Sequence, residues 1–186
     1  MTKRLIVGIS GATGVIYGIR LLQVLKKVTD VESHLVLSKA AEVTIQLETK
    51  YSVDQVKELA TVNHLFSNLA APISSGSFQT MGMVVIPCSM KSLSGIANCY
   101  NENLLIRAAD VTLKEKRRLV LVPRETPLHK GHLDLMMRFV DSGGILLPPF
   151  PAFYHAPQSI DDLIDQTVGK VLDLFEIKHS LFKRWQ

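Results

Sequence analysis

The chain has few cysteines and no long apolar run. Its 186 residues include two cysteines, Cys88 and Cys99, without a CxxC pair. Neither a disulfide framework nor a cysteine-based zinc site is therefore indicated. No apolar stretch approaches the roughly 20 residues that a membrane-spanning helix needs. The short apolar stretch after Lys3 and Arg4 runs into a glycine turn, which excludes a secretory signal and predicts a cytoplasmic protein.

The chain also lacks a concentrated basic region and metal-ligand spacing. Its net charge is +4, with Lys and Arg spread along the sequence, so nucleic-acid binding is not indicated. His129, His132 and His155 show no ligand spacing, and we expect no metal. A modest positive charge suits an anionic small substrate. The mean hydropathy of +0.19 is slightly high for a small monomer and suggests surface buried between subunits.

Apolar strands and amphipathic helices alternate along the chain. Strands are expected at residues 5–9, 31–37, 83–86, 119–122 and 145–147. Helices are expected at residues 15–27, 39–50, 102–116, 128–141 and 159–175, with a short helix opening at Ser52 and a loop at 63–80. Ser159 and Asp162 predict a capping box at the last helix. The pattern predicts an α/β fold, a single flavodoxin-like or Rossmann-like domain over residues 1–186 with helices on both faces of a parallel sheet.

The turn after the first strand is the strongest sign of a ligand. Ser10-Gly11-Ala12-Thr13-Gly14 joins that strand to the first helix. Glycine permits close approach of the backbone, and a helix N-terminus offers free N–H groups, so this turn predicts a bound phosphate. Its spacing is not G-x-G-x-x-G, and Ser38 rather than an acid ends the second strand. These departures disfavour NAD and favour a mononucleotide such as FMN, with a tight turn without ligand as the alternative.

The third apolar strand is followed by a loop rich in hydroxyl groups. Cys88 is interpreted as a buried, inert thiol, because no paired histidine is recognisable. The next four residues offer hydroxyl and N–H groups to a phosphate or a flavin ring: Ser89, Met90, Lys91 and Ser92. Ordinary capping of the following helix is the alternative interpretation. Since parallel strands end at one edge, this loop is expected beside the first turn.

Charged residues follow the fourth strand and lie on two helices. Arg124 and Glu125 stand between two prolines and are expected to project at the same edge, the arginine toward an anion and the glutamate as a proton donor. A surface ion pair is the alternative. Arg107 and Lys114 share a helix face, either as two cations for a phosphate or as a surface charge ladder. Lys170 borders the apolar stripe of the last helix, where an ordinary surface lysine is the alternative.

Together these motifs resemble those of the flavin prenyltransferases, the UbiX-type family formerly described as phenolic or aromatic acid decarboxylases. The resemblance runs from Arg4 to about Trp185. The motifs that carry it are Gly8-Ile9-Ser10-Gly11-Ala12-Thr13-Gly14, Leu37-Ser38-Lys39-Ala40-Ala41, Pro87-Cys88-Ser89, Arg107-Ala108-Ala109-Asp110-Val111, Leu121-Val122-Pro123-Arg124-Glu125, Phe153-Tyr154-His155-x-Pro157-Gln158-Ser159 and Arg184-Trp185.

The resemblance implies an activity. Family members bind FMN non-covalently and transfer a dimethylallyl group from dimethylallyl phosphate to reduced FMN. Alkylation at flavin N5 comes first, ring closure onto C6 follows, and no metal is needed. The prenylated FMN passes to a UbiD-type decarboxylase. Members are usually dodecamers with sites at subunit interfaces.

The resemblance also implies roles for particular residues. The flavin would be contacted by Gly11, Ala12, Thr13, Ser38, the loop Ser89, Met90, Lys91 and Ser92, and Arg124. Dimethylallyl phosphate would be held by Tyr154, Lys170, Arg107 and Lys114, with Trp185 near the prenyl group. Glu125 would assist phosphate departure or proton transfer, and Glu48 would lie near flavin N5, acting across an interface. The cations would neutralise the leaving phosphate, and the aromatic rings would stabilise a dimethylallyl cation.

The chain departs from the family pattern at two positions, and two other functions are alternatives. Thr13 stands where many members have Ser, and Lys170 stands where some have Arg, so bidentate contact with the phosphate is lost. One alternative function is direct, FMN-dependent decarboxylation of aromatic acids. The other is a non-enzymatic FMN carrier, although such carriers are usually acidic and this chain is basic.

Overall fold

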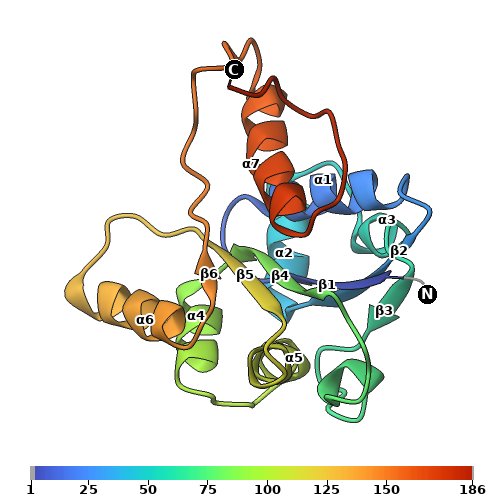
Figure 1. Ribbon diagram of the computed structural model, residues 1–186, viewed down its shortest axis with the longest axis vertical. Coiled ribbons are helices and arrows are strands. Elements are labelled where there is room, and N and C mark those ends of the chain that lie inside the picture. The colour runs from blue at the N-terminus through green and yellow to red at the C-terminus, as the bar shows by residue number, and fades with distance from the viewer. Residues whose placement is uncertain (1–2, 186) are drawn as a thin grey trace.

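A computed structural model describes residues 3–185, and within them six strands form one parallel sheet. The sheet has the order β3-β2-β1-β4-β5-β6 (Figure 1). The strands are β1 (Lys3–Ile9), β2 (Val31–Leu37), β3 (Val62–His64), β4 (Gly82–Cys88), β5 (Arg118–Pro123) and β6 (Ile145–Leu146). The α/β fold with a flavodoxin-like parallel sheet is thereby confirmed.

Helices cover both faces of the sheet, as near-continuous apolar strands require. One core contains side chains of α1 (Val15–Leu25), α2 (Lys39–Glu48), α3 (Val53–Lys57) and α7 (Ile160–Leu174). The other contains side chains of α4 (Met90–Ala97), α5 (Leu104–Lys114), α6 (Lys130–Asp141) and the 3-10 turn η1 (Pro72–Ser74).

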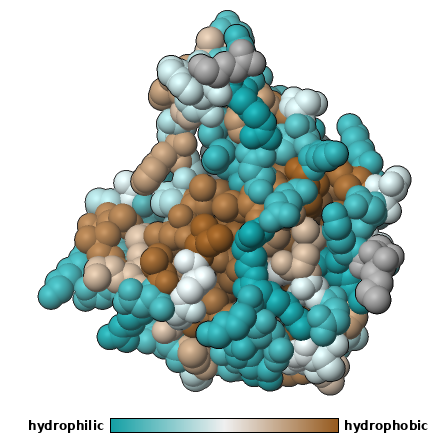
Figure 2. All heavy atoms as spheres, in the orientation of Figure 1, coloured by the Kyte–Doolittle hydropathy of each residue, from teal (hydrophilic) through white to brown (hydrophobic). Residues whose placement is uncertain are grey.

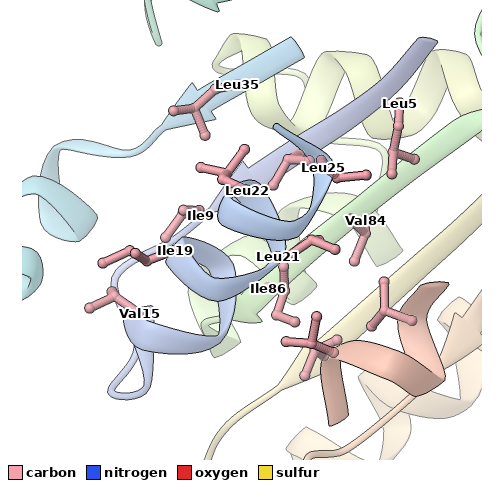
Figure 3. Close-up of a cluster of buried hydrophobic side chains, with 14 of the residues drawn as sticks. Leu5, Ile9, Val15, Ile19, Leu21, Leu22, Leu25, Leu35, Val84 and Ile86 are labelled. Atoms are coloured by element: carbon pink, nitrogen blue, oxygen red, sulfur yellow. The ribbon is translucent and has the colours of Figure 1, made fainter. Parts of the chain in front are cut away.

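Helix α1 packs closely on the middle of the sheet. Its side chains, Ile19 and Leu22 among them, point toward β1, β2 and β4 (Figure 3). Gly18 faces β4 so closely that a Cβ at this position would lie 2.4 Å from the Ile86 carbonyl oxygen. The absence of a side chain at Gly18 therefore fixes how near α1 lies to the sheet.

The last helix and the chain end form an arm that projects from the sheet. Residues 147–159 run from β6 to the far end of α7, and the C-terminal tail returns to the same place (Figure 1). The base of α7 packs against α1 through buried residues such as Val168 and Val171, whereas Ile160 at the tip is 76% exposed. Apolar side chains also gather on the surface between α6 and the base of α7 (Figure 2). Burying such surface against other chains would be favourable.

Most predicted elements are present, with shifts at their ends. The capping box of Ser159 and Asp162 is confirmed at α7, and Ser52 begins α3 with a second capping box. The stretch 63–80 was expected to be a loop, but it contains most of β3 and all of η1. A three-residue edge strand has too little apolar alternation to be recognised in the sequence.

Candidate functional site

The site lies where the chain reverses its direction across the sheet. Strand β1 pairs with β2 on one side and with β4 on the other, so the connections leave β1 in opposite senses. Parallel sheets bind ligands outside the carboxyl ends of strands at such a point. Ser10 joins the two strand ends: its hydroxyl donates to the Pro87 carbonyl (3.1 Å) and accepts from the Ser89 N–H (2.7 Å).

Three helix N-termini meet at this edge, because α1, α2 and α4 follow the adjacent strands β1, β2 and β4. Ser38 caps α2 by accepting from the Ala41 N–H (3.0 Å), and Ser89 caps α4 by accepting from the Ser92 N–H (3.3 Å). Helix capping, the alternative interpretation of the Ser89–Ser92 loop, is thus observed. It leaves the other N–H groups of the first turns available to an anion.

The glycine turn lies against the start of α2. A Cβ on Gly11 would be 2.3 Å from the Cβ of Ala40, so only glycine fits without moving one element. Gly14 has φ +93°, a left-handed conformation that glycine adopts without strain. Thr13 between them is exposed. The turn is therefore held close to α2, with the Thr13 side chain directed to solvent.

Glu48, the last residue of α2, contacts this turn in its own chain. Its carboxylate accepts a hydrogen bond from the Gly14 N–H (2.8 Å). No side chain caps α1 locally and its first turn holds no acidic residue, so Glu48 supplies the negative charge there. The contact lies within one chain, and the role across an interface that the resemblance implies for Glu48 stays a prediction.

Arg124 brings a permanent positive charge to the edge. Its backbone N–H donates to the Cys88 carbonyl (3.2 Å), which places the exposed side chain beside the end of β4. Burial raises the pKa of the Tyr17 phenol, and the positive charge of Arg124 opposes that shift. The guanidinium therefore lies near the first two turns of α1, where an anion would be attracted.

The other predicted residues of this edge have contrasting surroundings. Glu125 is exposed and its carboxylate accepts from the Thr126 N–H (3.1 Å). Met90 and Ser92 are half-buried in the first turn of α4, and Lys91 between them is exposed. Cys88 is fully buried, and burial raises the pKa of its thiol, so it stays neutral. The interpretation of Cys88 as an inert thiol is confirmed.

Within one chain, Arg107 and Lys114 are not brought to these loops. Arg107 donates to the Ser74 carbonyl (3.2 Å) and pairs with Asp110 (3.0 Å), a contact typical of the charge ladder that was the alternative interpretation. Lys114 ends α5 just before β5 begins, pairs with Glu115 and lies beside Gly76. That is the amino edge of the sheet, opposite the strand-end loops.

Tyr154 and Trp185 meet on the arm. Their rings pack edge to face with centroids 5.7 Å apart, and both side chains are partly or largely exposed. The segment that carries Tyr154 runs away from the sheet to the far end of α7 (Figure 1). Lys170 is exposed on α7. The structure thus places the predicted donor-binding residues on the arm with α7 and on α5, and none of them in the strand-end loops.

One residue near the site, Tyr17, was not singled out from the sequence, whereas Ser10 was part of the predicted phosphate turn. Tyr17 carried no signal, because an aromatic residue at helical spacing reads as core. Tyr17 lies near Arg124 because β5, which precedes Arg124, pairs with β4.

The residues at the β1 and β4 ends fit the phosphate and ring of a flavin mononucleotide. Gly11 gives the close approach, three helix N-termini give N–H donors, and Arg124 gives a cation. Among residues 3–185 no three His, Cys, Asp or Glu side chains are grouped to hold a metal ion. None of the helices described is long and apolar enough to cross a bilayer.

Known proteins are similar to this chain in sequence over nearly its full length. Residues 1–172 match the family model described as Flavoprotein. Flavin prenyltransferase UbiX of Escherichia coli K12 is 61% identical over 186 residues, covering 99% of this chain and 98% of the relative. The chain belongs to the UbiX flavin prenyltransferase family. The Thauera aromatica member is 55% identical over 182 residues, 98% of this chain and 93% of its own.

Solved structures of the family agree with the fold throughout. AnUbiX (PadA1), crystallised with FMN and dimethylallyl pyrophosphate, has a TM-score of 0.98 and 49% identity, covering 100% of this chain and 98% of its own. A dodecameric FMN-dependent UbiX-like decarboxylase from E. coli O157:H7 has a TM-score of 0.96 and 52% identity, covering 98% and 99%. The expected family and its FMN cofactor are confirmed.

Proposed function

We propose that this flavin prenyltransferase transfers a dimethylallyl group from dimethylallyl phosphate to N5 of reduced FMN and then closes a ring onto C6. In the first step the allylic C–O bond breaks, phosphate leaves, an N5–C bond forms and the N5 proton is lost. In the second step the alkene of the attached group takes up a proton, a C–C bond forms at C6 and the C6 proton is lost. The observation that carries the proposal is the convergence of three helix N-termini and Arg124 at the ends of β1, β2 and β4.

The strand-end loops are proposed to hold the flavin. Gly11, Ala12 and Thr13 would approach it through the backbone, and Ser38 with the Ser89, Met90, Lys91 and Ser92 turn would complete the contacts. Arg124 would bind an anionic or carbonyl oxygen. The close fit of Gly11 against Ala40 supports this role, since the turn cannot move away from α2 without a loss of packing.

The remaining cations are proposed to bind the departing phosphate. Arg107, Lys114 and Lys170 would neutralise its developing charge, helped by a protonated Glu125. Tyr154 and Trp185 would present their ring faces to the dimethylallyl group as positive charge develops on it. Glu48 would exchange protons near flavin N5.

These residues are proposed to meet only when several subunits assemble. Lys114 lies at the amino edge, and Tyr154 belongs to the segment between β6 and α7 that runs along the arm, so one chain does not gather them at its own flavin site. A related dodecamer shows that the fold forms large assemblies. We propose a dodecamer of one-domain chains, residues 1–186, in the cytoplasm, with dimethylallyl phosphate as donor and a UbiD-type decarboxylase as recipient of the product.

An anaerobic assay tests the reaction. The purified protein is incubated with reduced FMN and either dimethylallyl phosphate or dimethylallyl pyrophosphate, and the flavin is analysed by absorbance and mass spectrometry. If the monophosphate is the donor, the flavin mass should increase by one C5H8 group, and this result supports the proposal. Product with the pyrophosphate alone would correct the donor, and unmodified flavin with both would refute the transfer.

Direct decarboxylation is a second candidate, because one similar structure is described as an FMN-dependent decarboxylase. The same preparation is incubated with FMN and a hydroxybenzoate, and carbon dioxide is measured. Release of carbon dioxide without flavin modification would favour this function. Bound flavin that undergoes neither reaction would favour a carrier.

A further inference from the structure

The C-terminal tail is tied to α7 by one carboxylate. Asp173, in the last turn of α7, accepts a hydrogen bond from His179 Nε2 (3.0 Å). It also accepts two from Arg184, at 3.0 Å from Nη1 and 2.6 Å from Nη2. The bond from Arg184 holds the pKa of the Asp173 carboxyl below its usual range, so the ion pair persists at neutral pH.

The tail also packs along the helix. The His179 side chain is 2% exposed, and its Nδ1 accepts from the Leu181 N–H (3.2 Å). A Cβ on Gly169 would lie 2.5 Å from the Phe182 ring, so glycine lets the tail lie against α7. Arg184 stacks over Phe182 with 5.5 Å from its guanidinium carbon to the ring centroid. The path of the tail is thus fixed up to residue 184.

The next residue is Trp185, whose ring packs edge to face against Tyr154. Its side chain is 78% exposed, so little else within the chain holds it. Tyr154 in turn contacts His155 (5.5 Å between centroids), and His155 lies 6.4 Å from Phe182. The aromatic pair is therefore linked to Asp173 through Arg184 on one side and through Phe182 on the other.

We propose that Asp173 is a positioning residue that holds Trp185 against Tyr154 by clamping His179 and Arg184. The inference rests on the proposed function, in which these two rings bound the dimethylallyl group. Asp173 touches neither flavin nor donor in this scheme. It keeps the wall in place before the donor binds, so that ordering the tail costs no binding free energy.

The single tryptophan gives a direct readout, because Trp185 is the only one in the chain. Arg184→Gln removes the ion pair, and Lys183→Gln removes the same charge from the neighbouring residue, for which the structure shows no ion pair. The steady-state anisotropy of Trp185 fluorescence is measured on flavin-free protein. Because a released indole rotates more freely, we expect Arg184→Gln and Asp173→Asn to lower the anisotropy by about a third, Arg184→Lys to give an intermediate value, and Lys183→Gln to match wild type.

Kinetics then connect the clamp to the donor. Arg184→Gln should raise the KM for dimethylallyl phosphate about fivefold, with FMN affinity unchanged, because only the donor wall is loosened. Wild-type anisotropy in Arg184→Gln, or lowered anisotropy with an unchanged KM, would overturn the proposal. If wild-type protein prenylates no flavin, the proposed function is refuted. If wild-type protein is active but its KM does not depend on Arg184, only the clamp is refuted.

Discussion

The Gly14 N–H at the start of α1 donates a hydrogen bond to the carboxylate of Glu48 at the end of α2. The contact joins two elements 34 residues apart in the sequence. It gives the first helix an acidic partner that its own first turn lacks. The Glu48 carboxylate therefore already occupies the N-terminal end of α1. An anionic ligand is repelled there and is attracted instead to the free N–H groups of the other first turns.

Glu48→Gln separates the structural and chemical roles of this residue. Glutamine keeps a hydrogen-bond acceptor for Gly14 and loses the charge, so we expect a stability loss below about 1 kcal/mol. Prenylation should fall by about tenfold or more if the carboxylate moves a proton. Urea unfolding and single-turnover flavin mass analysis measure the two effects. A fully active variant would refute the proton-transfer role.

Gly11→Ala tests the flavin turn. The added methyl group would lie 2.3 Å from the Ala40 Cβ, so the turn must move away from α2. We expect FMN affinity, measured by quenching of flavin fluorescence, to fall about tenfold or more. The Gly11→Ala and Ala40→Gly double variant removes the clashing atom and should recover part of the affinity. Equal affinity in all three proteins would show that the turn does not contact the flavin.

Lys114 tests whether the donor cations come from another subunit. Lys114→Ala and Arg124→Ala are each expected to be inactive, the first lacking a phosphate ligand and the second a flavin ligand. Co-expressed in equal amounts, the two should recover about one quarter of wild-type activity if the two residues come from different chains. No recovery would mean that Lys114 serves the site of its own chain, contrary to its place at the amino edge.

His34 predicts acid sensitivity at the β2–β3 edge. Burial, together with the nearby His64 and Arg4, lowers the pKa of His34 to about 4 against the opposing effect of Glu32. The unfolded chain, with a pKa near 6.5, binds a proton first. Neutral His34 therefore makes its full contribution to the free energy of unfolding above about pH 6.5. That contribution is lost as pH decreases toward about 4, and the loss is at most about 3 kcal/mol.

The comparison uses His34→Gln, which keeps hydrogen-bonding groups without titrating. Urea midpoints are measured from pH 7 to pH 4 at fixed protein concentration. The pH dependence should be shallower in His34→Gln than in wild type. Equal slopes in wild type and His34→Gln would contradict the assignment.

The fold could be predicted from the sequence because its signals are local. A strand such as residues 119–122 and a helix cap such as Ser159 can each be recognised from a few consecutive residues. Strand β3 could not be recognised, because three residues gain their strand geometry from pairing with β2. The strand-end loops were placed together correctly because parallel strands share a carboxyl edge.

The site was predicted less completely, since its contacts join distant segments. The Glu48 contact with Gly14 depends on the angle between α1 and α2, and Tyr17 approaches Arg124 only through the order of β4 and β5. Arg107 and Lys114 share a helix, but which edge of the sheet receives Lys114 depends on the direction of α5. Periodicity gives the face of a helix and not the ligand that the face meets.

Gly18 shows that a residue remote from any ligand can set the shape of the site. Any side chain there would push α1 off the Ile86 carbonyl and carry the Ser10–Gly14 turn with it, one helical turn away. A mutational survey restricted to ligand-contacting positions would overlook this control. Engineering of the enzyme for bulkier flavins or donors should therefore treat the helix-to-sheet spacing as a variable in its own right.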